Sequence, residues 1–249
     1  VRFGRRITIR QENFRNAADA LAALGIETID GALLDLGLSW FHLRTPERGF
    51  SFQADGPLDM RMDRRAGSTA ADLVNTLPRQ ELTRILREYG EEQKAALIAK
   101  AIEKARIRGP IMGTMQLAQI VSSVFPPYPP RRIHPATLTF QALRIAVNDE
   151  LGALREGVDS LIRLLKPGGR LAIISFHSLE DRIVKQAFVE HARTCVCPPR
   201  LPVCGCDKRA DLKVVTKRPV MATEEEIAAN PASRSAKLRV AEKIAAQEK

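Results

Sequence analysis

The sequence predicts an α/β fold with a parallel-rich sheet and a helical insertion. Short apolar segments alternate with amphipathic helical segments towards both ends of the 249-residue chain, and this alternation is typical of parallel sheets covered by helices. Between residues 68 and 130 the apolar residues recur at helical spacing. We therefore expect a sheet domain formed by residues 1–67 and 131–249, with a helical insertion at residues 68–130.

The first elements predict a strand–helix–strand unit. Arg6 to Arg10 alternates charged and β-branched residues, which indicates a strand. Ala17 to Leu24 is rich in Ala and Leu and is followed by Gly25, which suits a helix with a glycine C-cap. Ile29 to Leu36 is short and apolar, as buried parallel strands are.

The stretch from Leu38 to Gly67 is dense in Arg, Asp, Phe and Gly. A loop of this length without secondary structure of its own is usually functional or disordered. Phe50, Phe52 and the turn at Gly56-Pro57 argue against disorder. We interpret the stretch as a binding loop at the end of a buried strand.

Helical periodicity dominates the elements that follow. Thr69–Asp72 has the pattern of a capping box, and Arg131–Leu165 has apolar residues at steps of three and four, which predicts one long helix. Lys166–Gly169 then predicts a turn, and Ser178 with Asp181 predicts the cap of another helix. Further helices are expected near Pro78, Glu91, Met115 and Thr223, and further strands at Arg170–Ser175, Leu212–Thr216 and Lys237–Ala241.

The net charge of +10 at pH 7 favours an anionic partner, and nucleic acid before a membrane surface. A basic protein without such a partner is the alternative. No apolar run approaches the roughly 20 residues that cross a bilayer, and no signal peptide opens the chain. We therefore expect a cytoplasmic protein that does not enter a membrane.

Polar side chains follow two predicted strands at the point where each strand ends. Asp35 and Ser39 follow the first, and Ser175 and His177 follow the second. In open α/β sheets, ligands bind beyond the carboxyl ends of the strands, so neighbouring strands would bring these groups into one crevice. The alternatives are a solvated strand-end role for Asp35 and a structural hydrogen-bonding role for His177.

Several longer motifs occur together in one order. They are ERGFSF and DGPLDMRMD between residues 47 and 63, HPATLTFQALRIAVN from residue 134, and LLKPGGRLAIISFHSLEDRIVK from residue 164. The tail NPASRSAKLRVAEK follows from residue 230. With these motifs the chain closely resembles the bacterial small-subunit rRNA cytosine-N4 methyltransferase family over nearly its whole length.

The resemblance implies a class I, Rossmann-like methyltransferase that moves a methyl group from S-adenosylmethionine to a cytidine in the decoding region of 16S rRNA. The implied partner is this rRNA or the 30S subunit, and a homodimer is compatible with the sequence. In such enzymes a helical insertion follows the fourth strand, where residues 68–130 lie, and we expect this insertion to recognise rRNA. The alternatives are methylation of DNA or protein by the same fold, and a non-catalytic RNA-binding or ribosome-assembly factor.

The resemblance also implies cofactor contacts by Phe14, after the third strand, and by Asp35, after the fourth. A third family contact is a glutamine in a pattern like SSPQL, and the matching segment here is Ser39–Leu43, so His42 stands where the glutamine is expected. The family's Gly-Gly-His loop and its ribose-holding acidic residue precede the third strand, and these 249 residues contain neither. Because the sequence opens on Val1 with no such loop, we expect it to begin inside the sheet domain.

The expected chemistry follows from the nucleophile. The exocyclic amine of cytosine is weakly nucleophilic, so catalysis requires in-line positioning and acceptors for the amine hydrogens, for which Asp35 and Ser39 are the candidates. A flipped base also needs stacking surfaces. Trp40, Phe41, Phe50 and Phe52 could stack on it, although Phe50 and Phe52 could equally anchor the loop in the core. Candidate phosphate ligands are Arg44, Arg48, Arg61, Arg64, Arg65, Arg131 and Arg132.

The four cysteines are Cys195, Cys197, Cys204 and Cys206, all within twelve residues. A cytosolic protein keeps its thiols reduced, which favours metal binding over disulfides. Four thiolates suit a closed structural zinc site, yet the C-x-C spacing is tighter than usual. A zinc site and a reduced structural or rRNA-facing loop are therefore both retained, and no metal is expected at the catalytic residues.

Overall fold

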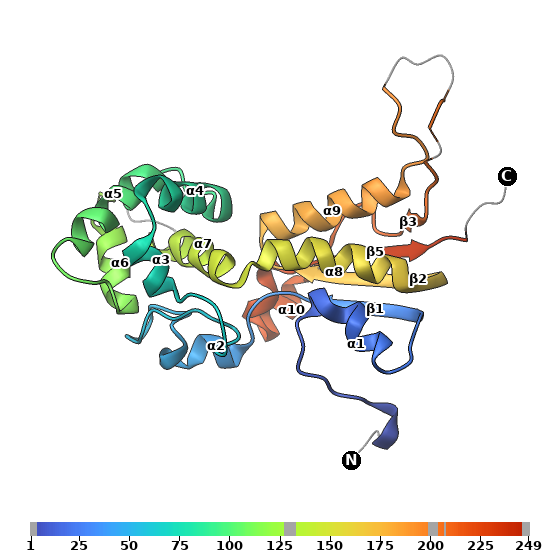
Figure 1. Cartoon of the computed structure of the whole chain (residues 1–249), viewed down its shortest axis with the longest axis horizontal. Coiled ribbons are helices and arrows are strands. Elements are labelled where there is room, and N and C mark those ends of the chain that lie inside the picture. Colours follow the sequence, from blue (N-terminus) through green and yellow to red (C-terminus); the bar gives the residue numbers. More distant parts are fainter. Residues whose placement is uncertain (1–3, 127–132, 199–203, 207, 246–249) are drawn as a thin grey trace. The chain divides into compact units, whose positions relative to one another are not determined.

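The computed structural model describes residues 4–126, 133–198, 204–206 and 208–245. The chain forms two compact units (Figure 1). The sheet unit comprises Val1–Gly37 and Leu151–Lys249, and the helical unit comprises Leu38–Glu150. None of the helices in the described residues is long and apolar enough to cross a membrane.

The sheet unit is built on strands in the order β1-β2-β5-β3, with β4 also paired to β5. β1 and β2 run parallel, and their register places Asp35 beside Ile174. The α/β class is confirmed, but the expectation of a parallel-rich sheet is wrong for the described strands, because their other three pairings are antiparallel. The strands are β1 (Ile29–Asp35), β2 (Leu165–Ser175), β3 (Leu212–Val214), β4 (Val220–Met221) and β5 (Lys237–Lys243).

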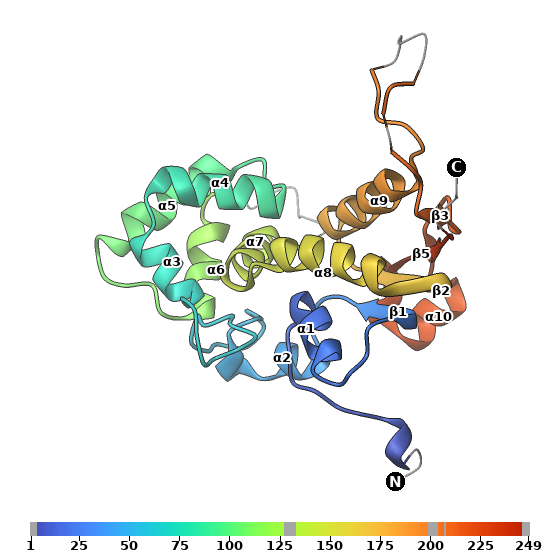
Figure 2. The same cartoon turned by 45° about the vertical axis from the view of Figure 1, so that its right-hand side comes forward.

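Among the helices of the sheet unit, α9 is the one that packs most extensively on the strands. α9 packs on β2, β3 and β5 (Figure 2), and its Phe188 is 1% exposed. Gly25, at φ +71°, ends α1 as predicted, with the Ile26 N–H donating to the Leu21 carbonyl at 3.0 Å. The helices are α1 (Ala17–Ala22), α8 (Glu150–Leu164), α9 (Ser178–Ala192) and α10 (Glu224–Ala229), with 3₁₀ turns at Gly4–Arg6, Phe14–Asn16 and Pro231–Ser235.

The strand predicted at Arg6–Arg10 is wrong. Residues 7–13 have no regular structure, and Ile7 and Ile9 are 52% and 88% exposed. Alternating residues favour a strand only where a neighbour completes its hydrogen bonds, and none of the described segments pairs with this one. The strand–helix–strand unit is therefore not formed by these residues. β1 lies where it was expected, but the expectation that it is a buried strand is wrong, because none of its residues is buried and Leu33 is 65% exposed.

The helical unit is formed by α2 to α7 and by the segment between α2 and α3. Thr69 caps α3, where its hydroxyl accepts from the Asp72 N–H at 3.0 Å, so the predicted capping box is confirmed. The unit is wider than the predicted insertion of residues 68–130, because it takes in both flanking segments. Its helices are α2 (Trp40–Arg44), α3 (Ala70–Thr76), α4 (Arg79–Gly90), α5 (Ala95–Arg106), α6 (Thr114–Ser122) and α7 (Thr137–Asn148), with a 3₁₀ turn at Pro46–Arg48.

Residues 38–67 are not the structureless loop that the sequence predicted. They contain α2 and the 3₁₀ turn, and Phe50, Leu58 and Met60 are 7%, 1% and 0% exposed in the core of the helical unit. Backbone bonds tie the segment to later elements, as where the Leu58 N–H donates to the Met112 carbonyl at 2.8 Å. The segment is therefore part of the unit's packed structure.

The single helix predicted from Arg131 to Leu165 is two helices. Residues 131 and 132 lie outside the described residues, α7 ends at Asn148, and α8 begins at Glu150. Asp149 separates them in the left-handed region at φ +47°, a conformation that Asp adopts more readily than most residues. Apolar periodicity continues across this break, which explains why the pattern alone predicted one helix.

Candidate functional site

The carboxyl ends of β1 and β2 lie together, as predicted. The two strands are parallel neighbours, and the Leu36 N–H donates to the Ile174 carbonyl at 3.0 Å directly after Asp35. Gly37 follows at φ +98°, where a Cβ would stand 3.4 Å from the Phe176 ring. A glycine here lets the chain leave β1 in a conformation that other residues rarely adopt.

Asp35 ends β1 with an exposed side chain. Among the described residues, none donates a hydrogen bond to its carboxylate or pairs with it. Asp30, at the other end of the same strand, has its carboxylate 2.8 Å from the Lys166 ammonium. Of these two strand-end carboxylates, Asp35 is therefore the one with neither oxygen bonded to another described residue.

Phe14 opens a 3₁₀ turn in which the Asn13 side chain accepts from the Arg15 N–H at 3.0 Å. The Phe14 ring lies against Gly157 of α8, so closely that a Cβ at Gly157 would stand 2.6 Å from it. Glycine within a helix costs about 1 kcal/mol of stability relative to alanine. At Gly157 the close packing of the Phe14 ring explains why glycine is present. Gly157 was not singled out from the sequence, where its signal is an isolated glycine inside a helical pattern.

His177, not Ser178, is the N-cap of α9. The His177 Nδ1 accepts from the Glu180 N–H at 3.4 Å, and the Glu180 carboxylate accepts from the His177 N–H at 3.3 Å. Glu180 is 3% exposed, so this reciprocal pair is built into the unit. The predicted box of Ser178 with Asp181 is therefore wrong, and the structural alternative holds for His177.

Two other polar side chains near the strand ends also have structural roles. Ser175 is 1% exposed, and its hydroxyl donates to the Lys237 carbonyl at 3.4 Å. The Asp181 carboxylate accepts from Arg239 at 2.6 and 3.1 Å, and these bonds hold the pKa of Asp181 below its ordinary value. Ser175 therefore belongs to the core.

In the helical unit, Ser39 and His42 are joined at the start of α2. The Ser39 hydroxyl accepts from the His42 N–H at 3.4 Å and lies 3.2 Å from the His42 Nδ1. Burial lowers the pKa of His42, and the positive charge of Arg48 lowers it further. Near neutral pH the ring is therefore uncharged, with one nitrogen donating and the other accepting.

The four candidate stacking residues divide into two pairs. Phe50 is 7% exposed, and Phe52 packs between the rings of His134 and Phe140 at centroid distances of 4.5 and 4.9 Å. Trp40 and Phe41, both on α2, are 56% and 65% exposed. Phe50 and Phe52 therefore anchor the core, and Trp40 and Phe41 remain open to a base.

The candidate phosphate-binding arginines of residues 44–65 have partners within the helical unit. Arg48 donates to the carbonyls of Arg61 and Met62 at 2.7 and 2.9 Å, and Arg61 pairs with Asp59 at 2.8 Å. Arg64 pairs with Asp59 at 3.6 Å, and further partners are Asp63 for Arg65 and the ring of Trp40 for Arg44. Arg131 and Arg132 lie outside the described residues. These bonds give the arginines structural roles beside any role with phosphate.

The segment at Met60 is held under backbone strain. Met60 is fully buried at φ +62°, a conformation that costs about 1–2 kcal/mol for a residue with a side chain. Asn148 holds the segment, since its Nδ2 donates to the Met60 carbonyl at 2.8 Å and its Oδ1 accepts from the Met62 N–H at 2.7 Å. Strained residues concentrate at functional sites, and neither residue was singled out from the sequence.

The predicted site residues are thus distributed over both units. Phe14 and Asp35 belong to the sheet unit, whereas Ser39 and His42 belong to the helical unit and contact each other. The structure accounts for the local position of each residue. Their action as one site stays a prediction.

Comparison with known proteins gives the chain its relatives. The model of the MraW methylase family matches residues 1–244. The protein named ribosomal RNA small subunit methyltransferase H of Syntrophotalea carbinolica is 56% identical over 97% of this chain and 77% of its own length. Proteins of the same name are 56% identical in Citrifermentans bemidjiense and 50% identical in Carboxydothermus hydrogenoformans, each over 97% of this chain and 78% of the relative.

The match covers both compact units, and the mixed α/β sheet agrees with a class I methyltransferase fold. By its match over residues 1–244, the chain belongs to the MraW methylase family.

Proposed function

We propose that this protein transfers the methyl group of S-adenosylmethionine to the exocyclic N4 of a cytidine in the decoding region of 16S rRNA, in rRNA or in the 30S subunit. Family membership supports methyl transfer, and the names of the relatives support small-subunit rRNA as the substrate. The structural observation that carries the proposal is the open carboxylate of Asp35 at the carboxyl end of β1, the place where α/β folds bind ligands.

The residues present fit such a cofactor. When bound, S-adenosylmethionine supplies an electrophilic methyl group. The Asp35 carboxylate would accept from a hydroxyl or amino group of the cofactor, and the Phe14 ring offers an apolar surface that Gly157 holds in place. His42, as an uncharged ring, can donate or accept one hydrogen bond in place of the amide expected there.

Ser39 can accept a hydrogen bond from the substrate amine while it still caps α2. Where the neutral His42 carries no proton on Nδ1, the Ser39 hydroxyl donates to this nitrogen and accepts from the His42 N–H. The hydroxyl oxygen then keeps a lone pair for an amine hydrogen of cytosine. This hydrogen bond localises the lone pair on the amine nitrogen of cytosine. The alignment of that nitrogen with the methyl group supplies the larger part of the catalysis.

The RNA is held by stacking and by charge in this proposal. The exposed rings of Trp40 and Phe41 would stack on the target base or a neighbour. The net charge of +10 supports a salt-dependent attraction to phosphates. The helical unit, which carries both rings, is the proposed rRNA-recognition part of the chain.

Calorimetric titration with S-adenosylmethionine tests the cofactor role of Asp35. In the protein expressed from its complete reading frame, Asp35→Asn should weaken binding about ten- to a hundredfold, because one charge-assisted hydrogen bond is worth about 1.5–3 kcal/mol. Asp30→Asn is the matched control on the same strand and should change affinity by less than about twofold. Unchanged binding by Asp35→Asn would remove Asp35 from the cofactor site. No binding by the unmodified protein would favour the non-catalytic RNA-binding or assembly factor.

A further inference from the structure

All four cysteines of the chain converge in the loop that joins α9 to β3. The Sγ atom of Cys204 lies 3.4 Å from that of Cys195, 3.9 Å from that of Cys197 and 3.6 Å from that of Cys206. The Sγ atoms of Cys195 and Cys206 are 3.7 Å apart, and all four lie within 4.8 Å of one another. The four sulfur atoms therefore form a compact cluster with Cys204 near every other member.

These distances are those of sulfur atoms around one metal ion. A zinc–thiolate bond is about 2.3 Å long, so two ligands of a tetrahedral ion lie about 3.8 Å apart. A disulfide would bring two sulfur atoms to about 2.05 Å, far less than the separations of 3.4 to 3.9 Å found here. The cluster therefore has the dimensions of a tetrahedral tetrathiolate site.

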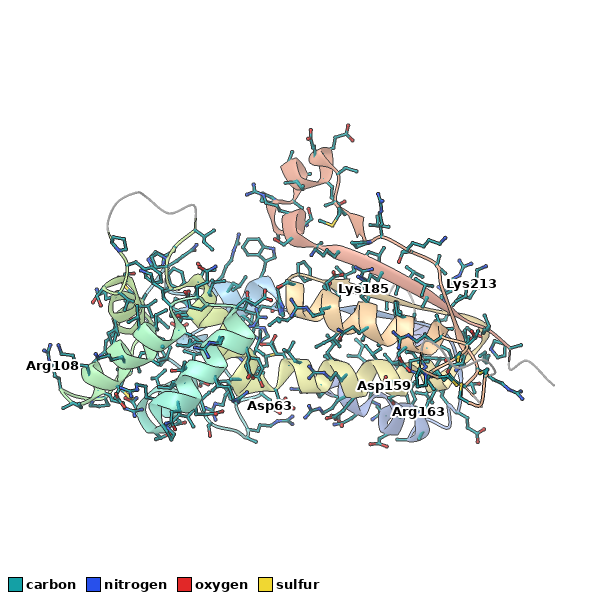
Figure 3. All side chains as sticks on the ribbon, turned by 90° about the horizontal axis from the view of Figure 1, so that it is seen from above. Asp63, Arg108, Asp159, Arg163, Lys185 and Lys213 are labelled. Atoms are coloured by element: carbon teal, nitrogen blue, oxygen red, sulfur yellow. The ribbon has the colours of Figure 1, made fainter. Side chains whose placement is uncertain are left out.

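Apolar burial does not account for the convergence. Cys195 and Cys204 are exposed, and Val196 between the first two cysteines is 53% exposed. The described residues of the loop form no helix or strand between Ala192 and Leu212. In Figures 1 and 2 they project away from the sheet between the end of α9 and β3, the strand that carries Lys213 in Figure 3. Such a loop needs another source of stability, which a metal supplies in small sites of this kind.

The surroundings suit the negative charge that four thiolates carry around a divalent ion. The Val196 N–H donates to the Cys206 Sγ at 3.4 Å, and the Cys197 N–H donates to the Cys195 Sγ at 3.3 Å. Arg193 and Lys208 flank the cluster in the sequence and both pair with Glu190 at the end of α9. Backbone N–H groups aimed at sulfur stabilise the ionised form, and ligand orientation by such second contacts is usual at metal sites.

The base of the same loop is already closed by the protein itself. The Asp211 N–H donates to the His191 carbonyl at 3.0 Å, and the two side chains meet at 2.9 Å. Lys243 of β5 pairs with the other oxygen of Asp211 at 3.0 Å. The ends of the loop are therefore fixed on the sheet unit, and the cysteine cluster fixes the part beyond them.

We propose that Cys195, Cys197, Cys204 and Cys206 form a closed structural zinc site that holds the loop between α9 and β3. Four protein ligands leave no open position, so the ion has a structural and not a catalytic role. Each C-x-C pair contributes two ligands from residues that are two positions apart, which lie on the same side of an extended chain. The site is independent of the cofactor residues and of the methyl transfer proposed above.

Elemental analysis of the purified protein tests the site. The protein should be prepared with reductant, without a histidine tag and without added chelator, and should contain one zinc ion per chain. Exchange for Co²⁺ should give the intense visible and sulfur-to-metal charge-transfer bands of a tetrahedral tetrathiolate. Cys204→Ser should lose the zinc and these bands. Val196→Ser, in the same loop, is the matched control and should keep both.

Thiol titration provides a second readout that does not depend on the variants folding. With zinc bound, the four thiols of the native protein should react slowly, and a zinc chelator should make all four reactive at once. Metal content near zero together with four freely reactive thiols would overturn the proposal. Iron in place of zinc, or a disulfide found by mass spectrometry in the freshly reduced protein, would overturn it as well.

Discussion

Asp35 and Asp30 stand at opposite ends of β1, and their surroundings differ in one respect that decides their roles. The Lys166 ammonium hydrogen-bonds to Asp30 and lowers its pKa, whereas no described residue bonds to Asp35. A carboxylate is kept open at a strand end only where solvent or a ligand satisfies it. The position of Asp35 could be predicted from the sequence because a strand that stops on a polar residue and a glycine marks its own end.

Other residue roles could not be predicted, because they depend on partners that are distant in the sequence. Gly157 has its function only through the Phe14 ring, and Asn148 only through Met60 and Met62. Ser39 was predicted as an acceptor for the substrate, and the structure shows in addition that it caps α2. Its catalytic role stays a prediction.

Gly157→Ala should weaken the binding of S-adenosylmethionine several-fold. The new methyl group would stand 2.6 Å from the Phe14 ring, so the ring must move, while the helix itself gains about 1 kcal/mol in propensity. Calorimetry gives the affinity, and thermal unfolding shows that the sheet unit stays folded. Phe14→Ala and the double variant should bind equally weakly, because two residues acting through one contact are not additive. Affinity equal to that of the unmodified protein would exclude this role for Gly157.

Among the elements, α2 combines a local capping structure with two exposed aromatic side chains. Its cap, Ser39 with His42, is internal to the helix, whereas Trp40 and Phe41 are exposed. Large exposed aromatic rings on one short helix indicate a surface that is covered in a complex. The capping pattern can be found in the sequence, but exposure could not be predicted, since Phe50 and Phe52 of the same stretch are in the core.

Replacing Trp40 or Phe41 with alanine should lower the affinity for small-subunit rRNA about five- to a hundredfold, the effect of about 1–3 kcal/mol for a lost stacking contact. Leu43→Ala is the control, since Leu43 is 42% exposed on the same helix and has no ring to stack. Filter binding at fixed salt concentration measures all three variants. Equal affinities for the aromatic variants and the control would show that α2 does not stack on RNA.

The segment between α2 and α3 should be sensitive to acid through Asp59. Burial alone would raise the pKa of Asp59, but hydrogen bonds from Arg61 and the charges of Arg61 and Arg64 outweigh it and lower this pKa below 3.8. The folded chain thus keeps Asp59 charged to lower pH than the unfolded chain does. Its stabilisation is fully present above pH 3.8 and is lost as the pH falls through the lowered pKa.

Asp59→Asn should therefore lower the free energy of unfolding by about 1 kcal/mol at neutral pH, and the difference from the unmodified protein should shrink below about pH 4. Urea unfolding at a series of pH values measures this. Asp63→Asn is the control, because the side chains of Asp63 and Arg65 are 54% and 75% exposed and solvent screens such a pair. A difference for Asp59→Asn that is the same at neutral and acidic pH would contradict the assignment.

Elements that are determined by their own residues, through capping or apolar patterns, were predicted well. Elements that depend on pairing with a segment distant in the sequence were not. β1, α3 with its capping box and α9 were found from their own residues. The strand expected at Arg6–Arg10 is wrong because no described segment pairs with it. The break at Asp149 was hidden because the apolar periodicity of α7 continues into α8.

At the scale of the whole molecule, the bounds of the two compact units are the feature that differs from the prediction. The helical unit was expected at residues 68–130, but the unit found is Leu38–Glu150. Phe50, Leu58 and Met60 lie in its core, so residues that precede the helices complete the packing of those helices. Such packing between distant segments cannot be predicted from local periodicity. The family resemblance could be recognised in the sequence, because it rests on motifs along the whole chain, and the family match confirms it.

The proposed cofactor contacts and the proposed base contacts belong to different units. The sheet unit carries Phe14 and Asp35, the proposed contacts of the cofactor, and the helical unit carries Trp40, Phe41 and Ser39, the proposed contacts of the target base. Methyl transfer needs both sets of contacts at once. The most direct test therefore follows the methyl group itself from donor to product.

That test is nucleoside mass spectrometry after reaction with isotope-labelled S-adenosylmethionine. The protein from the complete reading frame is incubated with small ribosomal subunits that lack the modification, with naked 16S rRNA and with DNA of the same sequence. The proposal predicts the labelled methyl group in N4-methylcytidine from the rRNA, and none in the DNA or the proteins. Label in another nucleoside, in DNA or in protein, or no transfer by a protein that binds the cofactor, would contradict it.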